Sequence, residues 1–287
     1  MACREDDNSM VISVASGKGG TGKTTVSTSL ALSINSSVQF LDCDVEEPNA
    51  HLFLKPKIKH TETVSIPVPE VDEAKCDFCG KCAEICAYNA IAVLNNRVLV
   101  FSQLCHGCGG CALLCPKSAI REVNRAIGTV ETGLARNVDF AHGRLNIGEA
   151  MSPPLIRAVK EHVNSNKTVI IDVPPGTSCP VVEAVKGSNF CVLVTEPTPF
   201  GLNDLALAVE VLKKINIPFG VVVNRYDAGY DKLDNYCKKE NIPIMMRIPF
   251  SKEIARAYSK GIPVVNAFPE YKKEFLILFE KIVEIAK

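Results

Sequence analysis

The sequence has no tryptophan, no net charge and no hydrophobic run long enough to cross a membrane. Its 287 residues carry 32 Lys and Arg against 32 Asp and Glu, and aromatic residues make up only 6%. Such a charge balance gives no general attraction to nucleic acid or to an anionic membrane. So few aromatic side chains also provide no platform on which bases could stack. We therefore expect neither nucleic-acid binding nor stable membrane association.

The N-terminal segment lacks the apolar stretch of a secretory signal, which predicts a cytoplasmic protein. A reducing cytosol disfavours disulfides, yet the chain has 13 cysteines. Most of them lie between Cys76 and Cys115. A dense local group of thiols in this compartment is better explained by metal ligation than by cross-linking.

A phosphate-binding loop is predicted at residues 16–25, where SGKGGTGKTT fits the pattern G-x-x-x-x-G-K-[ST]. It lies between a buried strand predicted at 11–15 and a helix predicted at 24–34. Glycines let the backbone N–H groups fold round an anion, and the helix N-terminus adds its positive end. We expect Lys23 to reach the β- and γ-phosphates and the Thr24 hydroxyl to ligate Mg²⁺. The predicted nucleotide-binding residues of this loop are Gly17, Lys18, Gly19, Gly20, Thr21, Gly22, Lys23, Thr24 and Thr25.

The lysine directly after Gly17 makes this loop resemble the deviant phosphate loop, K-G-G-x-G-K-[ST], of the MinD/ParA family of ATPases. The resemblance implies that ATP and ADP are the ligands and that the protein forms a nucleotide-sandwich homodimer. In that dimer Lys18 would reach the phosphates of the partner. A positive charge delivered in trans would act on the transition state as an arginine finger does.

Two acidic segments resemble the switch regions of the same family. Asp42 and Asp44 end a predicted strand at 38–42 in the pattern D-x-D, and Asp172 ends another before Pro-Pro-Gly. The resemblance implies that Asp44 lies near Mg²⁺ and orients the attacking water, with Asp42 as the alternative. It also implies that Asp172 holds Mg²⁺ through water. Otherwise these acids are solvated loop residues or helix caps. The predicted catalytic residues are Lys18, Lys23, Asp44 and Asp172, and the predicted Mg²⁺ ligands are Thr24, Asp44 and Asp172.

Three further positions are assigned through the resemblance. Gly176 is expected to sense the γ-phosphate through its backbone N–H. Asn224 ends a strand predicted at 219–224 and Pro249 follows one predicted at 244–248, and in the family such residues hold adenine. An amide side chain that pairs with the adenine amino group and a ring nitrogen favours ATP over GTP.

Regular alternation follows residue 168, because continuous apolar strands are separated by amphipathic helices. This pattern predicts an α/β fold with a mostly parallel sheet covered by helices on both faces. Residues 55–69 are polar, contain three prolines and lack helical period, which indicates a linker.

Beyond that linker the pattern C-x2-C-x2-C-x3-C occurs twice, at 76–86 and at 105–115, so that Cys76 matches Cys105 and Cys86 matches Cys115. This repeat is typical of a bacterial-type ferredoxin with two [4Fe–4S] clusters, in which the fourth cysteine of each run ligates the other cluster. Zinc is the competing interpretation, although zinc sites usually join two C-x2-C hooks across a longer loop. The predicted ligand sets are Cys76, Cys79, Cys82 and Cys115 for one cluster, and Cys105, Cys108, Cys111 and Cys86 for the other.

The prediction is therefore a MinD/ParA-type ATPase of residues 1–65 and 124–287, interrupted at 66–123 by a small α+β ferredoxin-like domain. ATP would switch a dimer whose clusters pass electrons, or cluster or metal cargo, to a redox protein or an apo-metalloprotein. The alternatives are an ATP-dependent iron–sulfur assembly scaffold and a redox-sensing positioning ATPase.

Overall fold

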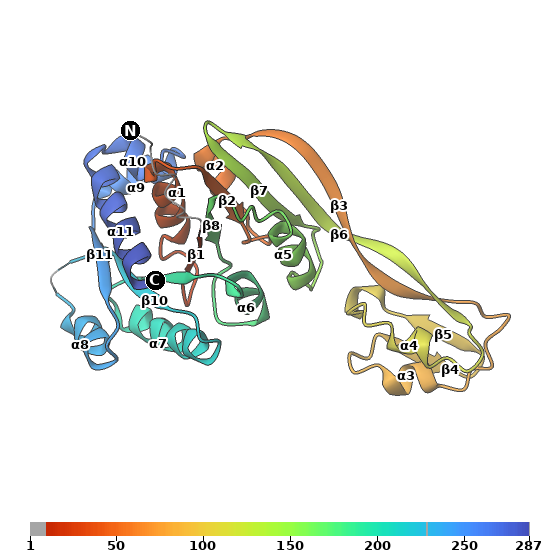
Figure 1. The fold of residues 1–287 in the computed structure, drawn as a ribbon. Coiled ribbons are helices and arrows are strands. Elements are labelled where there is room, and N and C mark those ends of the chain that lie inside the picture. Colours follow the sequence, from red (N-terminus) through yellow and green to blue (C-terminus); the bar gives the residue numbers. More distant parts are fainter. Residues whose placement is uncertain (1–9, 228, 287) are drawn as a thin grey trace.

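The computed structural model describes residues 10–227 and 229–286; the N-terminal segment in which no secretory signal was expected falls mostly outside them. Its main feature is a nine-stranded sheet in the order β11-β10-β9-β1-β8-β2-β7-β6-β3 (Figure 1). Neighbouring strands from β11 to β7 are parallel, whereas β6 pairs antiparallel with both β7 and β3. The mostly parallel α/β sheet predicted from the sequence is thus confirmed. Its strands are β1 Val11–Ala15, β2 Val38–Asp42, β3 Lys57–Val71, β6 Ile120–Ala135, β7 Val138–Leu145, β8 Thr168–Asp172, β9 Phe190–Thr195, β10 Phe219–Tyr226 and β11 Ile244–Pro249.

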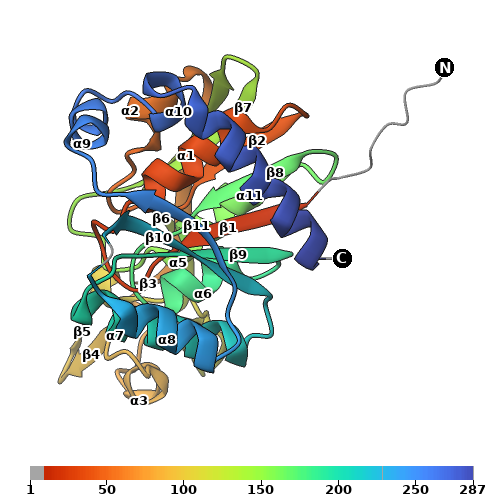
Figure 2. The same cartoon turned by 90° about the vertical axis from the view of Figure 1, so that its left-hand side faces the viewer.

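Helices cover both faces of this sheet (Figure 2). Alternate residues of a strand point to opposite faces, so Val221 and Val223 of β10 join one core while Val222 joins the other. The first core packs against α5 to α8 and the second against α1, α10 and α11. Among the described residues, no helix combines the length and the apolar character needed to cross a bilayer. The helices are α1 Lys23–Ser33, α2 Ala50–Leu54, α5 Pro153–Lys160, α6 Cys179–Val185, α7 Pro199–Lys214, α8 Asp231–Lys239, α9 Lys252–Ser259, α10 Val264–Ala267 and α11 Glu270–Ala286.

The predicted linker at 55–69 is wrong, because most of it belongs to the long strand β3. Pro67 and Pro69 are tolerated there because β3 lies at the edge of the sheet, where a missing N–H costs no central ladder bond. No strand was assigned from the sequence to its partner β6 or to the following β7.

Strands β3 and β6 continue beyond the sheet as a two-stranded ribbon. Residues 65–71 pair with 120–126, whereas β7 accompanies β6 only from Gly128 to Ala135. The far end of this ribbon carries residues 72–119, which we call the cysteine segment (Figure 1). It consists of α3 Lys81–Ile85, the hairpin of β4 Ile91–Leu94 and β5 Arg97–Val100, the 3₁₀ turn η1 Ser102–Leu104, and α4 Gly110–Leu113.

The cysteine segment repeats its backbone as well as its cysteines. Left-handed residues, with positive φ, occur in pairs that have the same offset along the chain as Cys76 and Cys105. The backbone therefore turns in the same way after equivalent cysteines, which is the physical form of the sequence repeat. The pairs are Phe78 and Gly107, Gly80 and Gly109, and Asn89 and Ser118.

Candidate nucleotide site and cysteine cavities

A cavity of about 290 Å³ lies at the edge where β1, β2, β8, β10 and β11 end. Ligands of parallel α/β sheets bind at this carboxyl edge. The structure brings together here most residues that the sequence assigned to the nucleotide, from loops far apart in the chain. Those that line the cavity are Gly19, Gly20, Gly22, Lys23, Thr24, Thr25, Asp44, Asn224 and Pro249. Those that do not line it are Gly17, Lys18, Thr21, Asp172 and Gly176.

The phosphate loop is held closely from two sides. A Cβ atom at Gly17 would lie 2.1 Å from the Asp204 carbonyl oxygen of α7, and one at Gly22 would lie 2.2 Å from the Asn224 amide nitrogen. Gly22 also has φ +95°, which favours glycine. The Asn224 side chain donates a 2.8 Å hydrogen bond to the Thr21 carbonyl. Asn224 therefore fastens the loop to β10 at the wall of the cavity.

Buried carboxyl groups surround Lys23 and Thr24. Asp172 is 1% exposed, and neither of its carboxyl oxygens has a hydrogen-bond partner within the described chain. Burial raises the pKa of Asp172 to about 6, against the opposing charge of Lys23 and the nearby hydroxyl groups of Thr24 and Ser27. Burial likewise raises the pKa of Asp44 to about 7, with Lys23 again opposing and Asp172 adding to the rise. Uncompensated buried carboxylates are costly, and a divalent cation would relieve that cost.

Asp42 is used differently from its neighbour. Its two carboxyl oxygens accept hydrogen bonds from the Asp44 N–H, at 3.1 Å, and from the Ala50 N–H, at 3.0 Å. Asp42 thus fixes the loop between β2 and α2, while Asp44 is the carboxyl group of this pair that faces the cavity.

Gly176 lies away from the cavity. Its N–H donates a 3.0 Å hydrogen bond to the Ser16 carbonyl, and its φ is +101°. In this conformation the N–H expected to sense the γ-phosphate is bonded within the chain.

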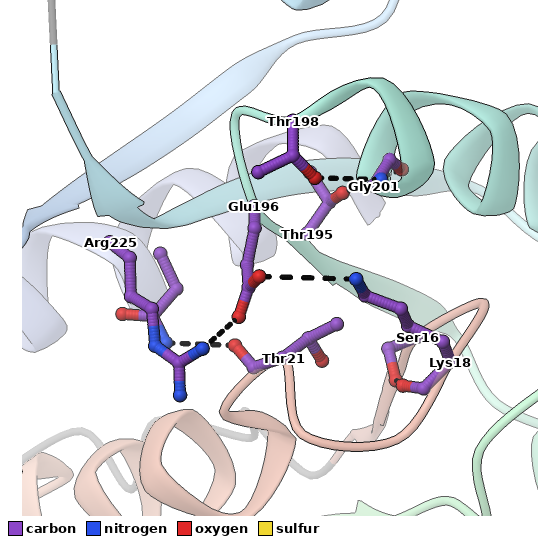
Figure 3. A network of polar contacts seen from close by, with 9 residues as sticks. Ser16, Lys18, Thr21, Thr195, Glu196, Thr198, Gly201 and Arg225 are labelled. Atoms are coloured by element: carbon purple, nitrogen blue, oxygen red, sulfur yellow. Dashed lines mark hydrogen bonds and ion pairs between the residues drawn. The ribbon is translucent and has the colours of Figure 1, made fainter.

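Lys18 points towards β9 and forms an ion pair within its own chain (Figure 3). Its Nζ lies 4.0 Å from one carboxyl oxygen of Glu196, whose other oxygen accepts a 2.5 Å hydrogen bond from Arg225. The Glu196 loop is itself fixed, because the Thr195 hydroxyl donates to the Gly201 carbonyl and the Thr198 hydroxyl accepts from the Gly201 N–H. Glu196 was not predicted, because an acid shortly before a helix has no distinguishing motif.

Several cavity residues also escaped prediction. Arg225 follows Asn224 directly and has φ +52°, so its side chain turns to the wall that Asn224 also lines. Glu47 and Asn49 lie after β2, and Pro175 lies after β8. The remaining ones lie after β11, where the sequence has no motif beyond Pro249 that would identify them. They are Phe250, Ser251, Ile254, Ala255 and Tyr258.

The cysteine segment contains two further cavities, each lined by four cysteines. Each set combines three cysteines of one run with the last cysteine of the other. The first cavity is lined by Cys76, Cys79, Cys82 and Cys115. The second is lined by Cys86, Cys105, Cys108 and Cys111.

Backbone N–H groups donate hydrogen bonds to the sulfur atom of the last cysteine of each run. Ala90 donates to Cys86 Sγ at 3.2 Å and Ala119 donates to Cys115 Sγ at 3.3 Å, so the two bonds occupy equivalent positions of the repeat. None of the cysteines that the structure describes forms a disulfide. Within the described ranges, no three His, Cys, Asp or Glu side chains converge closely enough to hold a single metal ion.

Comparisons with known proteins agree with the phosphate loop and the sheet. The family model described as the CobQ/CobB/MinD/ParA nucleotide binding domain matches residues 12–264. An uncharacterized protein of Methanocaldococcus jannaschii is 34% identical over 280 residues, 96% of this chain and 97% of the relative. An iron–sulfur cluster carrier protein of Pyrococcus abyssi is 24% identical over 299 residues, 96% and 86% of the two chains.

Among solved structures, the septum site-determining protein MinD of Pyrococcus horikoshii, complexed with Mg-ADP, superposes with a TM-score of 0.57 at 21% identity. The match covers 95% of each chain, so the MinD-like fold extends over nearly the whole molecule. On the family match and the phosphate loop together, the chain belongs to the CobQ/CobB/MinD/ParA nucleotide-binding family and is a P-loop ATPase of the MinD/ParA type.

Proposed function

We propose that this protein is an ATP-switched iron–sulfur protein, in which nucleotide state controls electron transfer, or delivery of a cluster or metal, to a partner. Residues 66–123 form its ferredoxin-like domain, inserted into an ATPase domain of residues 1–65 and 124–287. The observation that carries the proposal is the crossed lining of the two cysteine cavities. Each gathers four thiols in the combination that two [4Fe–4S] clusters require.

The donors fit such clusters in number and kind. Each cavity offers four thiols, and backbone N–H groups bond Cys86 and Cys115. Hydrogen bonds to cluster sulfurs are among the features that set the potential of these centres. A bound cluster would supply one-electron chemistry, while the chain supplies its ligands, hydrogen bonds and charges.

At the nucleotide site, Lys23 is the charge that binds phosphate and Thr24 and Asp172 hold Mg²⁺. The two unpartnered oxygens of Asp172 fit this use, because an ion or its water would satisfy both. Asp44 faces the cavity and orients the attacking water. Its raised pKa near 7 suits a group that exchanges a proton with water at neutral pH. Asn224 and Pro249 hold the base.

The ATP-bound form is a homodimer in which Lys18 acts on the nucleotide of the partner. Lys18 must then leave Glu196, to which it is paired in the single chain. Glu196 keeps its second cation, Arg225, so the carboxylate is not left unpaired when Lys18 moves.

A continuous backbone path joins the nucleotide site to the cysteine segment. The Val45 carbonyl, directly after Asp44, accepts a 2.9 Å hydrogen bond from the Leu145 N–H at the end of β7. Leu145 in turn pairs with Gly128 of β6, the strand that continues into the ribbon. A shift of the Asp44 loop on ATP binding therefore displaces the base of the ribbon.

An iron–sulfur assembly scaffold is the second candidate, and the relatives that are iron–sulfur cluster carrier proteins favour it. Such a scaffold would pass iron and sulfide to an apo-protein. The switched protein would keep its clusters through turnover. The two functions therefore differ in whether the chain loses iron and sulfide during turnover.

The test uses anaerobically purified full-length protein, assayed for iron, sulfide and zinc and by EPR after dithionite reduction, with and without Mg-ATP. We expect about eight irons per chain and a reduced-cluster spectrum that changes with Mg-ATP. Lys23→Ala should keep the iron and lose the response to ATP. Cys79→Ser should lose iron, whereas the matched control Cys179→Ser, also an exposed cysteine, should not.

Stoichiometric zinc without iron would overturn the iron–sulfur part of the proposal. Eight irons with a spectrum that ATP leaves unchanged would overturn the coupling alone. Transfer of iron and sulfide to an apo-protein, with depletion of the donor chain, would select the scaffold.

A further inference from the structure

The backbone turns in the same way around both cysteine cavities, but the side chains that line the two cavities differ. At the offset that relates Cys76 to Cys105, most lining positions of one cavity have a counterpart in the other. Four of these pairs differ in charge or polarity, so the repeat supplies an internal comparison. The pairs, first cavity before second, are Asp77 and His106, Lys81 and Gly110, Val93 and Glu122, and Lys117 and Tyr88.

The first cavity is lined by an ion pair. Lys117 Nζ lies 3.8 Å from a carboxyl oxygen of Asp77, and Lys81 adds a second ammonium group to the lining. Two lysines against one aspartate leave this cavity with one net positive charge. No other Lys, Arg, Asp or Glu of the described chain lines it.

The second cavity is closed at the equivalent positions by a ring stack. The rings of Tyr88 and His106 are parallel within 5° and their centroids are 3.4 Å apart. The single carboxylate in the lining is that of Glu122, which lies over Gly109, where a Cβ would be 3.3 Å from its oxygen. No described Lys or Arg lines this cavity, so its Lys, Arg, Asp and Glu side chains carry one net negative charge.

We infer that the two sites have unequal reduction potentials and that the first electron given to the oxidised pair resides at the Cys76 set. This rests on the proposed clusters. Reduction adds one negative charge to a cluster, which Lys81 and Lys117 favour and Glu122 opposes. The cysteine spacing and the left-handed turns repeat at both sites, whereas these charged side chains do not, so we assign the difference to them.

The inferred order also gives a direction along the molecule. The second cavity lies beside Pro67, Pro69 and Glu122 of the ribbon, and the first beside Val71 and Ile120 at its outer end. An electron therefore settles at the site further from the sheet. If one cluster is reduced and the other oxidised, transfer from the Cys105 set to the Cys76 set oxidises the donor by one electron and reduces the acceptor by one. That step needs no other reactant.

The test is a redox titration of the full-length, cluster-loaded protein with dithionite, followed by EPR at low ionic strength because exposed charges are screened by salt. Lys117→Gln should lower the higher potential, and Glu122→Gln should raise the lower one. Each removes one partly exposed charge, so each should change its reduction equilibrium by about 2- to 10-fold. At about 59 mV per tenfold change, this is about 20–60 mV. Lys213→Gln, which removes an exposed charge of α7 and lies in neither lining, is the matched control and should move neither potential.

The variants also assign the potentials, because each acts on one cavity. Two equal potentials, or a Lys117→Gln change in the lower potential, would overturn the inference while the clusters themselves stand. A chain without iron would overturn both the inference and the proposed function, and metal analysis separates the two failures.

Discussion

The nucleotide cavity and the cysteine segment are built on opposite principles. The cavity collects side chains from loops that follow five different strands, and the Asp44 and Asp172 carboxyl groups at this edge have raised pKa values. The cysteine segment collects its groups from two short runs between Cys76 and Cys115, mostly partly exposed and set by repeated left-handed turns. One site depends on the whole sheet, and the other depends on local spacing.

This difference means that a substitution which disrupts the nucleotide cavity should leave the cysteine segment intact, and the reverse. A change at the nucleotide edge should alter nucleotide binding and the stability of the sheet without altering cysteine chemistry. The predictions below test that separation, from the largest expected effect to the smallest.

Lys23→Ala should weaken ATP binding by about 30- to 1000-fold, because it removes a buried positive charge that we propose to bind phosphate. Isothermal calorimetry with Mg-ATP measures the loss, and iron content should be unchanged. Lys213→Ala, which removes an exposed lysine of α7, is the control and should bind ATP like the parent. Loss of iron together with ATP binding in the Lys23 variant would show that the two ends are not independent.

Asp44 should make the unliganded protein less stable as pH rises. Its folded pKa of about 7 exceeds the usual value of 3.8, so the folded state keeps a proton that the unfolded state releases between those values. The free energy of unfolding therefore falls from about pH 4 to pH 7 and levels off above. Asp44→Asn should be more stable than the parent at pH 7.5, by on the order of 2–4 kcal/mol, with the gap closing towards pH 4.

Urea unfolding at a series of pH values, without and with Mg²⁺, measures this contribution. Mg²⁺ should flatten the slope of the parent, because the ion stabilises the carboxylates. If the free energy of unfolding changed with pH in the same way in the parent and in the variant, the pKa of Asp44 would not be raised in the folded protein. The iron content of the variant, measured across the same pH range, shows whether the cysteine segment is affected by the change at Asp44.

What the sequence predicted follows the same division. The two groups of cysteines that line the cavities could be named from spacing alone, because spacing within one segment determines which thiols lie near one another, while their role as cluster ligands stays a prediction. At the nucleotide edge the loop glycines, Lys23 and Asp44 were identified by motif, but Tyr258 and Glu196 were not. Such residues reach a site only through strand order and side-chain packing, which a single sequence does not encode locally. The ribbon was mistaken for a linker because prolines mark loops in sequence, while edge strands also accept them.

Gly17→Ala should lower the free energy of unfolding by about 1–3 kcal/mol, because the new methyl group meets the Asp204 carbonyl 2.1 Å away. Gly19→Ala is the matched control: no atom lies within 4 Å of its added Cβ and its φ is not positive. Thermal unfolding of both variants measures the difference. Equal stability would mean that α7 does not clamp the loop, and the nucleotide edge would then depend less on the fold than we argue.

Glu196→Gln should have the smallest effect, because a partly exposed ion pair at 4.0 Å contributes little. Freed from the carboxylate, the Lys18 amine should be acylated about 1.5- to 5-fold faster in the monomer, as followed by mass spectrometry. The same substitution at Glu240, which pairs with Lys213 at 2.8 Å far from the site, should accelerate Lys213 and leave Lys18 unchanged. If Lys18 reacts at the same rate with and without the Glu196 carboxylate, this lysine is not held within its own chain, and dimerisation would require no release. If the rate rises, the charge proposed to act on the partner is restrained by a residue that only the fold brings to it, as is typical of the nucleotide end and not of the cysteine end.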